Sequence, residues 1–357
     1  MSDALRPGST IGILGGGQLG RMLAVAASRL GLKCHVYDPG SDVPAAEVAA
    51  HATTAAWDDE AALRAFASSV DVVTYEFENV PTASLDLIES IVPIRPNRRA
   101  LAVSQDRIDE KNLLRSLGLA TAPYAAVDDA GSLDAAMAEI GAPAILKTRR
   151  FGYDGKGQAR IMSADAAAAA LAEMNGAPSI LEGFVEFSHE VSVIGARGLD
   201  GAVACFDPGE NRHEDGILRE TTVPARLTAS QRTDAVLLAA KILTELDYVG
   251  VMGVELFVTP QGLVINEIAP RVHNSGHWTQ DGCLIDQFEQ HVRAVAGWPL
   301  GDGARHSDVV MENLIGDDVD RIQQIAATQS AIHLYGKAEA RPGRKMGHVN
   351  RITGPVR

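Results

Sequence analysis

Cysteine is scarce in this chain of 357 residues, which contains only Cys34, Cys205 and Cys283. Their number is odd, and no two of them form a C-x-x-C pair. This pattern argues against a disulfide-stabilised scaffold and against a zinc site, and it is typical of proteins from reducing compartments. We therefore expect three free thiols that serve as packing residues, in a cytoplasmic protein.

Long apolar runs and concentrated basic stretches are also missing. No segment approaches the roughly 18 apolar residues that cross a bilayer, and the first twelve residues contain no apolar core of a secretion signal. Acidic residues outnumber basic ones, 46 to 32, and the formal net charge is −14. A chain of this charge repels nucleic acids unless it carries a dense basic patch. The sequence thus predicts no membrane and no nucleic-acid partner.

What is present is an ordinary globular composition, with 46% hydrophobic and 22% charged residues, and enough length for two or three structural units. The first hundred residues alternate between strand and helix patterns. A short apolar run at 10–14 leads through a glycine turn into an apolar helix at 21–30, and further strands are expected at 33–37 and 70–77. Such alternation predicts a parallel, doubly wound α/β sheet.

The middle of the chain has a different, α+β pattern. Expected helices lie at 105–118, 164–174 and 229–246, and expected strands at 144–148, 158–162, 179–182, 190–196, 202–207, 253–258 and 263–268. After Trp298-Pro299 the composition becomes richer in glycine and aspartate, and residues 336–351 are strongly basic. We therefore expect a small terminal domain at residues 301–357.

The glycine turn at 15–20 matches G-x-G-x-x-G, and Asp38 follows where a dinucleotide enzyme places its ribose-binding acid. Taken alone, this motif suggests NAD. Its physical content is narrower, because glycines permit a sharp turn that exposes helix N-terminal amides to any nearby phosphate or ribose. NAD binding, contact with another ligand and a purely structural turn all stay open at this point.

A second glycine-rich stretch at 151–158 follows the strand that ends near Lys147. Glycines around Asp154 and Lys156 indicate a flexible flap whose backbone amides can close over phosphates. The alternative is a plain polar hairpin. The spacing does not match the G-x-x-x-x-G-K-[ST] motif, since no Ser or Thr follows Lys156.

Two carboxylates occur within otherwise apolar strand patterns, Glu255 in 254–257 and Glu267 in 264–267, with Asn266 beside the second. If these strands pair as a hairpin, the carboxylates converge on one site. Burying such groups is costly unless they bind a metal or an ionic partner, and hard oxygen ligands that bridge to phosphates suit Mg²⁺ or Mn²⁺. A magnesium site is the main interpretation, and ordinary salt bridges are the alternative.

Together these features resemble the ATP-grasp superfamily in order and spacing. Five segments make the chain similar to one of its families, the N5-carboxyaminoimidazole ribonucleotide synthetases: residues 75–80 (YEFENV), 105–107 (QDR), 151–158 (FGYDGKGQ), 271–279 (RVHNSGHWT) and 341–348 (RPGRKMGH). The resemblance implies an ATP-grasp fold at 106–300 with a flexible lid at about 120–185. A Rossmann-like pre-ATP-grasp domain at 1–105 and a small C-terminal domain at 301–357 complete it.

The resemblance also implies the activity. ATP would phosphorylate bicarbonate to carboxyphosphate, which carboxylates 5-aminoimidazole ribonucleotide in purine biosynthesis, with Mg²⁺ or Mn²⁺ held by Glu255 and Glu267. By similarity, ATP would contact Arg107, Lys147, Tyr153, Asp154, Gly155, Lys156, Gly157, Gln158, Glu182, Gly183, Phe184, Val185, Glu190, His213, Asn266 and Glu267. The catalytic set would be Arg271, His273, Asn274, Tyr153 and Asp154.

The ribonucleotide acceptor carries a phosphate and a ribose, so the resemblance implies a second anion site. Its expected residues are Gly16, Gly17, Gln18, Glu76, Lys337, Arg344 and Lys345. A solvated charged face is the competing interpretation of the basic tail. Among functions, the alternatives are an ATP-grasp ligase that activates another carboxylate, an NAD-dependent oxidoreductase, and a noncatalytic nucleotide-binding regulator. The family resemblance also favours a homodimer.

Overall fold

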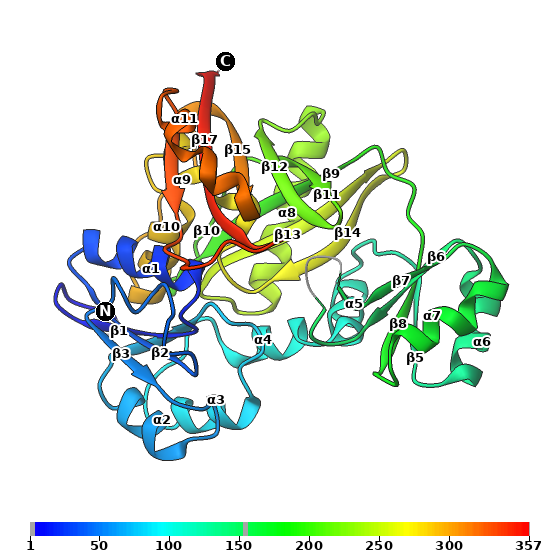
Figure 1. The fold of residues 1–357 in the computed structure, drawn as a ribbon, viewed down its shortest axis with the longest axis horizontal. Coiled ribbons are helices and arrows are strands. Elements are labelled where there is room, and N and C mark those ends of the chain that lie inside the picture. Colours follow the sequence, from blue (N-terminus) through cyan, green and yellow to red (C-terminus); the bar gives the residue numbers. More distant parts are fainter. Residues whose placement is uncertain (1–3, 153–155, 357) are drawn as a thin grey trace.

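Three β-sheets organise the chain, as Figure 1 shows for residues 4–152 and 156–356, which the computed structural model describes. The first sheet belongs to the N-terminal part of the chain, the second to a lobe that projects to the right in Figure 1, and the third runs through the centre. Among the described residues, no helix has both the length and the apolar character required to cross a membrane.

The N-terminal sheet has four parallel strands in the order β3-β2-β1-β4. Its strands are β1 (Thr10–Leu14), β2 (Lys33–Asp38), β3 (His51–Thr54) and β4 (Val72–Tyr75). The associated helices are α1 (Gln18–Arg29), α2 (Glu60–Ala67), α3 (Thr82–Glu89) and α4 (Arg98–Ser104). Because side chains alternate along a strand, Ile13 packs in one core cluster with α1, and Leu14 packs in another with α2 and α3. The predicted doubly wound sheet is confirmed.

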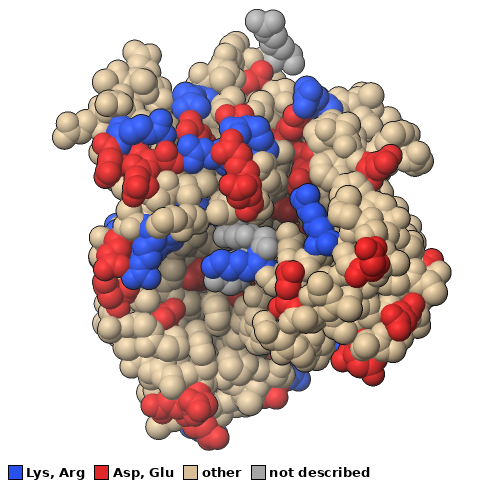
Figure 2. All heavy atoms as spheres, turned by 45° about the vertical axis from the view of Figure 1, so that its right-hand side comes forward, with Lys and Arg blue, Asp and Glu red and all other residues tan. Residues whose placement is uncertain are grey.

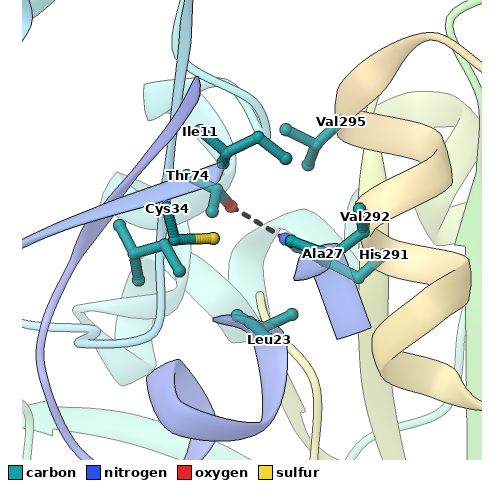
Figure 3. A pocket seen from close by; sticks show the side chains of 9 residues that line it. Ile11, Leu23, Ala27, Cys34, Thr74, His291, Val292 and Val295 are labelled. Carbon is teal, nitrogen blue, oxygen red and sulfur yellow. Dashed lines mark hydrogen bonds between the residues drawn. The ribbon is translucent and has the colours of Figure 1, made fainter. Parts of the chain in front are cut away.

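A helix from a distant part of the chain, α10 (Gln287–Ala296), packs against α1 on this sheet. Figure 3 shows the interface between the two helices and the sheet, where Ile11, Leu23 and Val295 line a gap with no space for a water molecule. Buried His291 links three segments there. Its Nδ1 accepts a hydrogen bond from Val251 N (3.0 Å), so the proton lies on Nε2, which donates to Thr74 Oγ1 (2.8 Å). Burial lowers the pKa of His291 to about 3, which keeps the ring neutral.

The projecting lobe is a four-stranded antiparallel sheet with the order β5-β8-β6-β7 and its own core. Its strands are β5 (Tyr124–Val127), β6 (Ala144–Thr148), β7 (Gln158–Ile161) and β8 (Ser179–Gly183), and its helices are α6 (Ala130–Ile140) and α7 (Ala167–Glu173). The alanine-rich stretch begins as a short 3₁₀ turn, Ala164–Ala166, before α7. Helix α5 (Arg107–Ser116) precedes this lobe and begins after Asp106, whose carboxylate accepts from Ile108 N.

The central sheet has the order β14-β13-β9-β11-β12-β15-β17-β16, with β10 paired to β9. Its strands are β9 (His189–Arg197), β10 (Val203–Cys205), β11 (Gly209–Glu214), β12 (Ile217–Val223), β13 (Gly250–Thr259), β14 (Gly262–Ala269), β15 (Ser307–Ile315), β16 (Ala331–Leu334) and β17 (Lys345–Pro355). Helix α8 (Ala229–Glu245) packs against β9, and the shorter segments are Asn274–Gly276, α9 (Thr279–Gly282), Gly316–Arg321 and α11 (Ile322–Ala326).

The last three strands extend this sheet instead of forming a sheet of their own. Antiparallel pairing of β12 with β15 joins them to the rest, and Val309 and Met311 share a core cluster with α1 and α10. This arrangement brings the basic tail against the N-terminal part of the chain. All three cysteines are free thiols, with Cys34 and Cys283 buried and Cys205 partly buried, as expected for packing residues.

Candidate active site

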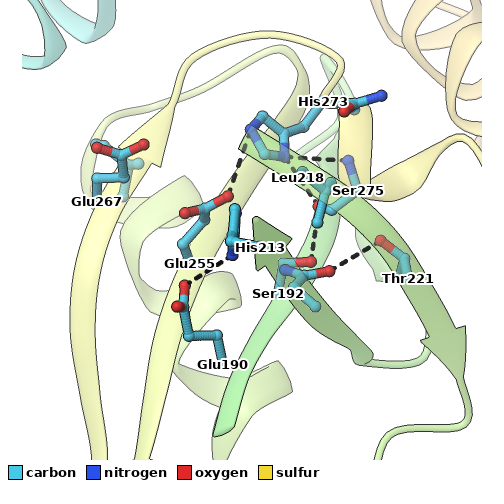
Figure 4. A network of polar contacts seen from close by, with 12 residues as sticks. Glu190, Ser192, His213, Leu218, Thr221, Glu255, Glu267, His273 and Ser275 are labelled. Atoms are coloured by element: carbon cyan, nitrogen blue, oxygen red, sulfur yellow. Dashed lines mark hydrogen bonds and ion pairs between the residues drawn. The ribbon is translucent and has the colours of Figure 1, made fainter. Parts of the chain in front are cut away.

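The two strand carboxylates lie opposite each other in a hairpin. Strands β13 and β14 pair antiparallel, with Glu255 directly across from Glu267. Side chains of directly opposite residues share one face of a sheet and lie within a few ångströms of each other. The predicted hairpin and the convergence of its carboxylates are therefore confirmed (Figure 4).

Neighbouring charges shift the pKa values of the two carboxylates in opposite directions. Burial and then the charge of Glu267 raise the pKa of Glu255 to about 8. Although burial opposes it, Arg107 lowers the pKa of Glu267, and Arg107 NH1 lies 3.1 Å from Glu267 Oε2. Two hard oxygen donors that repel each other in this way fit a divalent cation, which would relieve the repulsion.

A second group of side chains lies beside Glu255. Glu190 from β9 and His213 from β11 place ligand atoms within 4.8 Å of one another and of a Glu255 oxygen. His213 Nδ1 lies 3.3 Å from Glu190 Oε2, and, against the effect of burial, this carboxylate raises the pKa of His213 above its ordinary value. These residues from three strands thus form one polar surface with the hairpin (Figure 4).

The loop after β14 adds a neutral histidine to this surface. His273 Nδ1 accepts from Ser275 N at 3.4 Å and lies 2.8 Å from Ser275 Oγ, which leaves Nε2 as the protonated atom, 3.6 Å from Glu255 Oε1. Burial, followed by the charges of Arg271 and Lys345, lowers the pKa of His273 well below its usual value. Gly253 makes this approach possible, because a Cβ at that position would lie 2.7 Å from His273 Cβ.

Arg271 and Asn274 flank His273 but have different partners. Arg271 Nε lies 2.8 Å from Glu78 Oε1, so this loop touches the segment after β4. Asn274 forms a reciprocal amide pair with buried Asn313 of β15, at 2.9 and 2.7 Å. Arg271 therefore reaches the N-terminal unit, while the Asn274 side chain is held by the C-terminal strands.

Lys147 and Glu182 meet in the projecting lobe. Lys147 Nζ donates to Glu182 Oε2 at 2.9 Å, and this pair, from β6 and β8, is largely buried. Burial opposes the shift, but Lys147 and Lys111 lower the pKa of Glu182 below its ordinary value. The second carboxylate oxygen, Oε1, is buried without a hydrogen-bond partner among the described residues. It is a free acceptor in the segment 182–185, which was expected to contact ATP.

Residues 183–185 and the described part of the flap combine backbone hydrogen bonds with exposed side chains. Gly183 N donates to Pro123 O and Phe184 N to Pro143 O, while the Phe184 side chain is exposed and Val185 follows it. In the flap, Gly157 has a left-handed φ of 69° and lies close to Thr148. Lys156, which precedes it, is exposed. Gln158 begins β7 and pairs with Lys147 of β6. Tyr153, Asp154 and Gly155 lie outside the described residues.

The glycine turn at the start of α1 is occupied by acidic side chains. Gly16 N donates to Asp38 Oδ2 at 2.8 Å, and Gly17 N donates to Glu76 Oε1. A Cβ on Gly17 would lie 2.7 Å from that same oxygen, so a larger residue here would displace the Glu76 carboxylate. Two amides that a pyrophosphate would need are therefore engaged by carboxylates, which argues against the NAD interpretation. Gln18 is the first residue of α1.

Two lysines of the basic tail act on different parts of the site, one on the glycine turn and the other on the hairpin. Lys337 Nζ donates to Lys345 O at 2.8 Å, the Lys337 charge acts on Glu76, and the Lys345 charge acts on Glu255 and His273. The tertiary structure thus brings Lys337 near Glu76 of the expected acceptor site, and Lys345 near Glu255 and His273 instead. Arg344 instead donates to the Glu339 carbonyl at 2.9 Å, within the tail itself.

Sequence reasoning missed the contribution of helix α5 beyond Arg107. Glu110 and Lys111 both contact β14. The available signal was the helical spacing of 107, 110 and 111, which places them on one face.

The face of the molecule in Figure 2 is hollowed near its centre, and basic side chains border the hollow.

Comparisons with known proteins match the whole of this architecture. The ribonucleotide synthetase preATP-grasp domain matches residues 9–105, the ATP-grasp domain 112–288, and the phosphoribosylaminoimidazole carboxylase C-terminal domain 309–355. N5-carboxyaminoimidazole ribonucleotide synthase of Brucella melitensis is 55% identical over 353 residues, 98% of both chains. The chain belongs to the N5-carboxyaminoimidazole ribonucleotide synthase family. Its members are ATP-grasp ligases, and the enzyme class that the resemblance implied is thereby confirmed.

Solved structures of the N5-carboxyaminoimidazole ribonucleotide synthase family have the same fold. The Staphylococcus aureus synthetase complexed with ADP is 37% identical, with a TM-score of 0.94 over 98% of this chain and 95% of that one. The Aspergillus clavatus synthase in complex with ADP and 5-aminoimidazole ribonucleotide is 32% identical, with a TM-score of 0.91 over 98% and 95%. The predicted combination of a pre-ATP-grasp domain, an ATP-grasp domain and a C-terminal domain is confirmed.

Proposed function

We propose that this chain uses ATP and bicarbonate to carboxylate the amine of 5-aminoimidazole ribonucleotide, and that it releases N5-carboxyaminoimidazole ribonucleotide, ADP and phosphate. The observation that carries the proposal is the position of Arg271 and His273, between the carboxylate hairpin and the segment of Glu76 and Glu78. A small anion at this position would lie between a nucleotide site and an acceptor site. The Aspergillus clavatus synthase, solved in complex with ADP and 5-aminoimidazole ribonucleotide, supports it.

The nucleotide site would lie between the projecting lobe and the hairpin. Lys147 and Arg107 supply positive charge for phosphates, Glu182 Oε1 is a free acceptor for an adenine amine, and Glu190 faces the same surface with His213. Glu255 and Glu267 would hold Mg²⁺ or Mn²⁺, which neutralises phosphate charge when it is bound. Asn266 and the backbone at 183–185, together with the flap residues 153–158, complete the set proposed for ATP.

Bicarbonate would be held against the terminal phosphate by Arg271, His273 and Asn274. A bicarbonate oxygen attacks the γ-phosphorus, the bond to the β-phosphate oxygen breaks, and carboxyphosphate and ADP form. Arg271 stabilises the anion, and the Nε2–H of neutral His273 is an uncharged donor. The acceptor amine then bonds to the carboxyl carbon, either directly with expulsion of phosphate or after carboxyphosphate has broken down to CO₂ and phosphate, and the amine gives up one proton, which the released phosphate can accept. We assign Tyr153 and Asp154 to this step as a proposal from family resemblance.

The acceptor nucleotide would lie against the glycine turn. Gly16, Gly17 and Gln18 form the floor, and Glu76 is proposed to bind the ribose hydroxyls. Lys337, Lys345 and Arg344 are proposed for the acceptor phosphate, with the two lysines better supported because their charges act at the site. Homodimer formation and a cytoplasmic location stay predictions.

Phosphate release from ATP and Mg²⁺ tests the proposal directly. Rates are compared without acceptor, with bicarbonate alone, and with bicarbonate plus 5-aminoimidazole ribonucleotide. We expect the ribonucleotide to stimulate release and to be consumed in a one-to-one ratio with ATP. If the ribonucleotide has no effect while bound ADP is still detected, a ligase for another carboxylate becomes the better explanation, and formate and amino acids are the next substrates to assay.

Glu76→Gln is expected to separate acceptor binding from nucleotide binding. The amide keeps an acceptor for Gly17 N but loses the negative charge for ribose hydroxyls. We expect the KM for the ribonucleotide to rise about 10-fold or more, as is typical for loss of a charged hydrogen bond, while the Kd for ADP stays within about 2-fold. Steady-state kinetics and calorimetry measure the two constants. Equal losses in both would show that Glu76 acts through the fold.

Glu76→Gln is also expected to change how the stability of the protein depends on pH. Burial raises the pKa of Glu76 to about 7, against the usual value of 4.5, so the folded state binds more protons than the unfolded state between these values. Stability therefore falls as pH rises from about 4.5 to 7. Glutamine mimics the protonated form, and we expect it to be more stable than wild type at pH 8, by about 3 kcal/mol, and equally stable at pH 4. Thermal unfolding at both pH values measures the difference.

A further inference from the structure

One face of helix α5 contacts consecutive residues of the strand that carries the second hairpin carboxylate. Arg107 pairs with Glu267, and Glu110 Oε1 accepts a hydrogen bond from Ile268 N at 2.6 Å. Residues at helical positions i, i+3 and i+4 share a face, so Lys111 lies on this face too. The helix therefore holds β14 through its backbone as well as through the Arg107 ion pair.

Lys111 makes the contact that spans two sheets. Its side chain is completely buried, its Nζ donates to the Asn266 carbonyl at 2.5 Å, and it lies 3.9 Å from Glu182 Oε2. Asn266 belongs to β14 of the central sheet, whereas Glu182 belongs to β8 of the projecting lobe. Glu182 already pairs with Lys147 through the same oxygen, so two lysines orient this carboxylate and leave Oε1 as its free acceptor.

Burying an ammonium group costs free energy unless hydrogen bonds and opposite charges compensate for the lost solvation. We propose that Lys111 is a positioning residue for nucleotide binding, which fixes the strand of Asn266 and Glu267 relative to Glu182 on the opposite lobe. This inference deepens the proposed function, because it assumes that ATP binds between these elements. Lys111 would not touch the nucleotide; it would set the distance between the metal-binding strand and the adenine acceptor.

A purely structural role is the alternative, in which Lys111 only balances the buried charge of Glu110. The two roles predict different behaviour in a double variant. Glu110→Gln removes that charge while its amide oxygen can still accept from Ile268 N. If charge balance is the whole role, Lys111→Met combined with Glu110→Gln should bind nucleotide like wild type.

The experiment measures the Kd for ADP in the presence of Mg²⁺ by calorimetry, together with the Mg²⁺ concentration for half-maximal phosphate release and the Tm. Lys111→Met keeps an unbranched side chain without the ammonium. Lys241→Met is the matched control, since Lys241 Nζ also donates to a backbone carbonyl, Leu117 O at 2.6 Å, but on the exposed face of α8. If Lys111→Met does not fold, the double variant, which has no unpaired buried charge, is measured in its place.

We expect Lys111→Met and the double variant to raise the Kd for ADP about 10- to 100-fold, as for loss of a charged hydrogen bond, and to raise the Mg²⁺ requirement. Lys241→Met should leave both unchanged. The proposal is overturned if the double variant binds within about 2-fold of wild type, or if Lys111→Met lowers only the Tm. Failure of the proposed function would look different: wild type would bind ADP, but the ribonucleotide would not stimulate turnover.

Discussion

Glu267→Gln is expected to reduce phosphate release by about 10²- to 10³-fold, because metal-assisted charge stabilisation is worth several kcal/mol. The change keeps the size of the side chain but removes the charge that pairs with Arg107 and that would bind the cation opposite Glu255. The loss should be accompanied by a higher Mg²⁺ concentration for half-maximal rate. Initial rates across a Mg²⁺ titration measure both quantities.

Glu245→Gln provides the matched control for Glu267. Glu245 also pairs with an arginine, Arg99 at 3.4 Å, but on the exposed end of α8, away from the hairpin. Exposed pairs contribute little, so this variant should keep wild-type rates. A Glu267→Gln enzyme with normal Mg²⁺ dependence and a rate within about 3-fold of wild type would contradict the metal assignment.

Arg271→Ala is expected to lower ribonucleotide-dependent turnover by about 10²- to 10³-fold, similar to the removal of one oxyanion donor, with the Kd for ADP within about 2-fold of wild type. The reason is its position: Arg271 bonds to Glu78 and its charge reaches Glu76 and His273, whereas the proposed nucleotide contacts lie across the hairpin. Turnover is measured from product formation and the Kd for ADP by calorimetry, and the comparison separates the two effects.

Loss of Arg271 also leaves Glu78 without its ion pair, so two further variants are needed. Arg271→Ala with Glu78→Gln removes both charges and should be as inactive as the single variant if Arg271 contacts the reacting anion. Arg226→Ala breaks an arginine–glutamate pair with Glu210 at an exposed position and should retain activity. Recovery of activity in the double variant would instead assign Arg271 a structural role.

Local patterns were sufficient to predict several elements of the site. The apolar run, glycine turn and helix at the N-terminus, and the strands around Glu255 and Glu267, were predicted because hydrophobic periodicity and glycine placement act over a few residues. The predicted helix at 105–118 is shorter in the structure, since Asp106 caps its first turn and Gly118 adopts a left-handed φ of 69° beyond its end.

Long-range neighbours could not be predicted in the same way. The sequence predicted a small C-terminal domain but not how it attaches: β15, β17 and β16 continue the central sheet, and a strand pattern does not specify its partner strand. Helix α10 was missed, and it covers the N-terminal sheet with His291 bonded to Thr74. The NAD motif was ambiguous until the structure placed Asp38 and Glu76 on the turn amides.

The sequence by itself determined the kinds of chemistry available: a carboxylate pair on adjacent strands, a glycine-rich flap, and a loop at 271–274 with guanidinium, imidazole and amide groups, all of which follow from residues close together in the chain. Only the tertiary structure decided which of these groups meet. Lys111 lies between Asn266 and Glu182, and Lys337 acts on Glu76, across separations of 155, 71 and 261 residues. Burial makes such contacts strong, because a desolvated charge requires a partner, and the fold alone determines which partner is near.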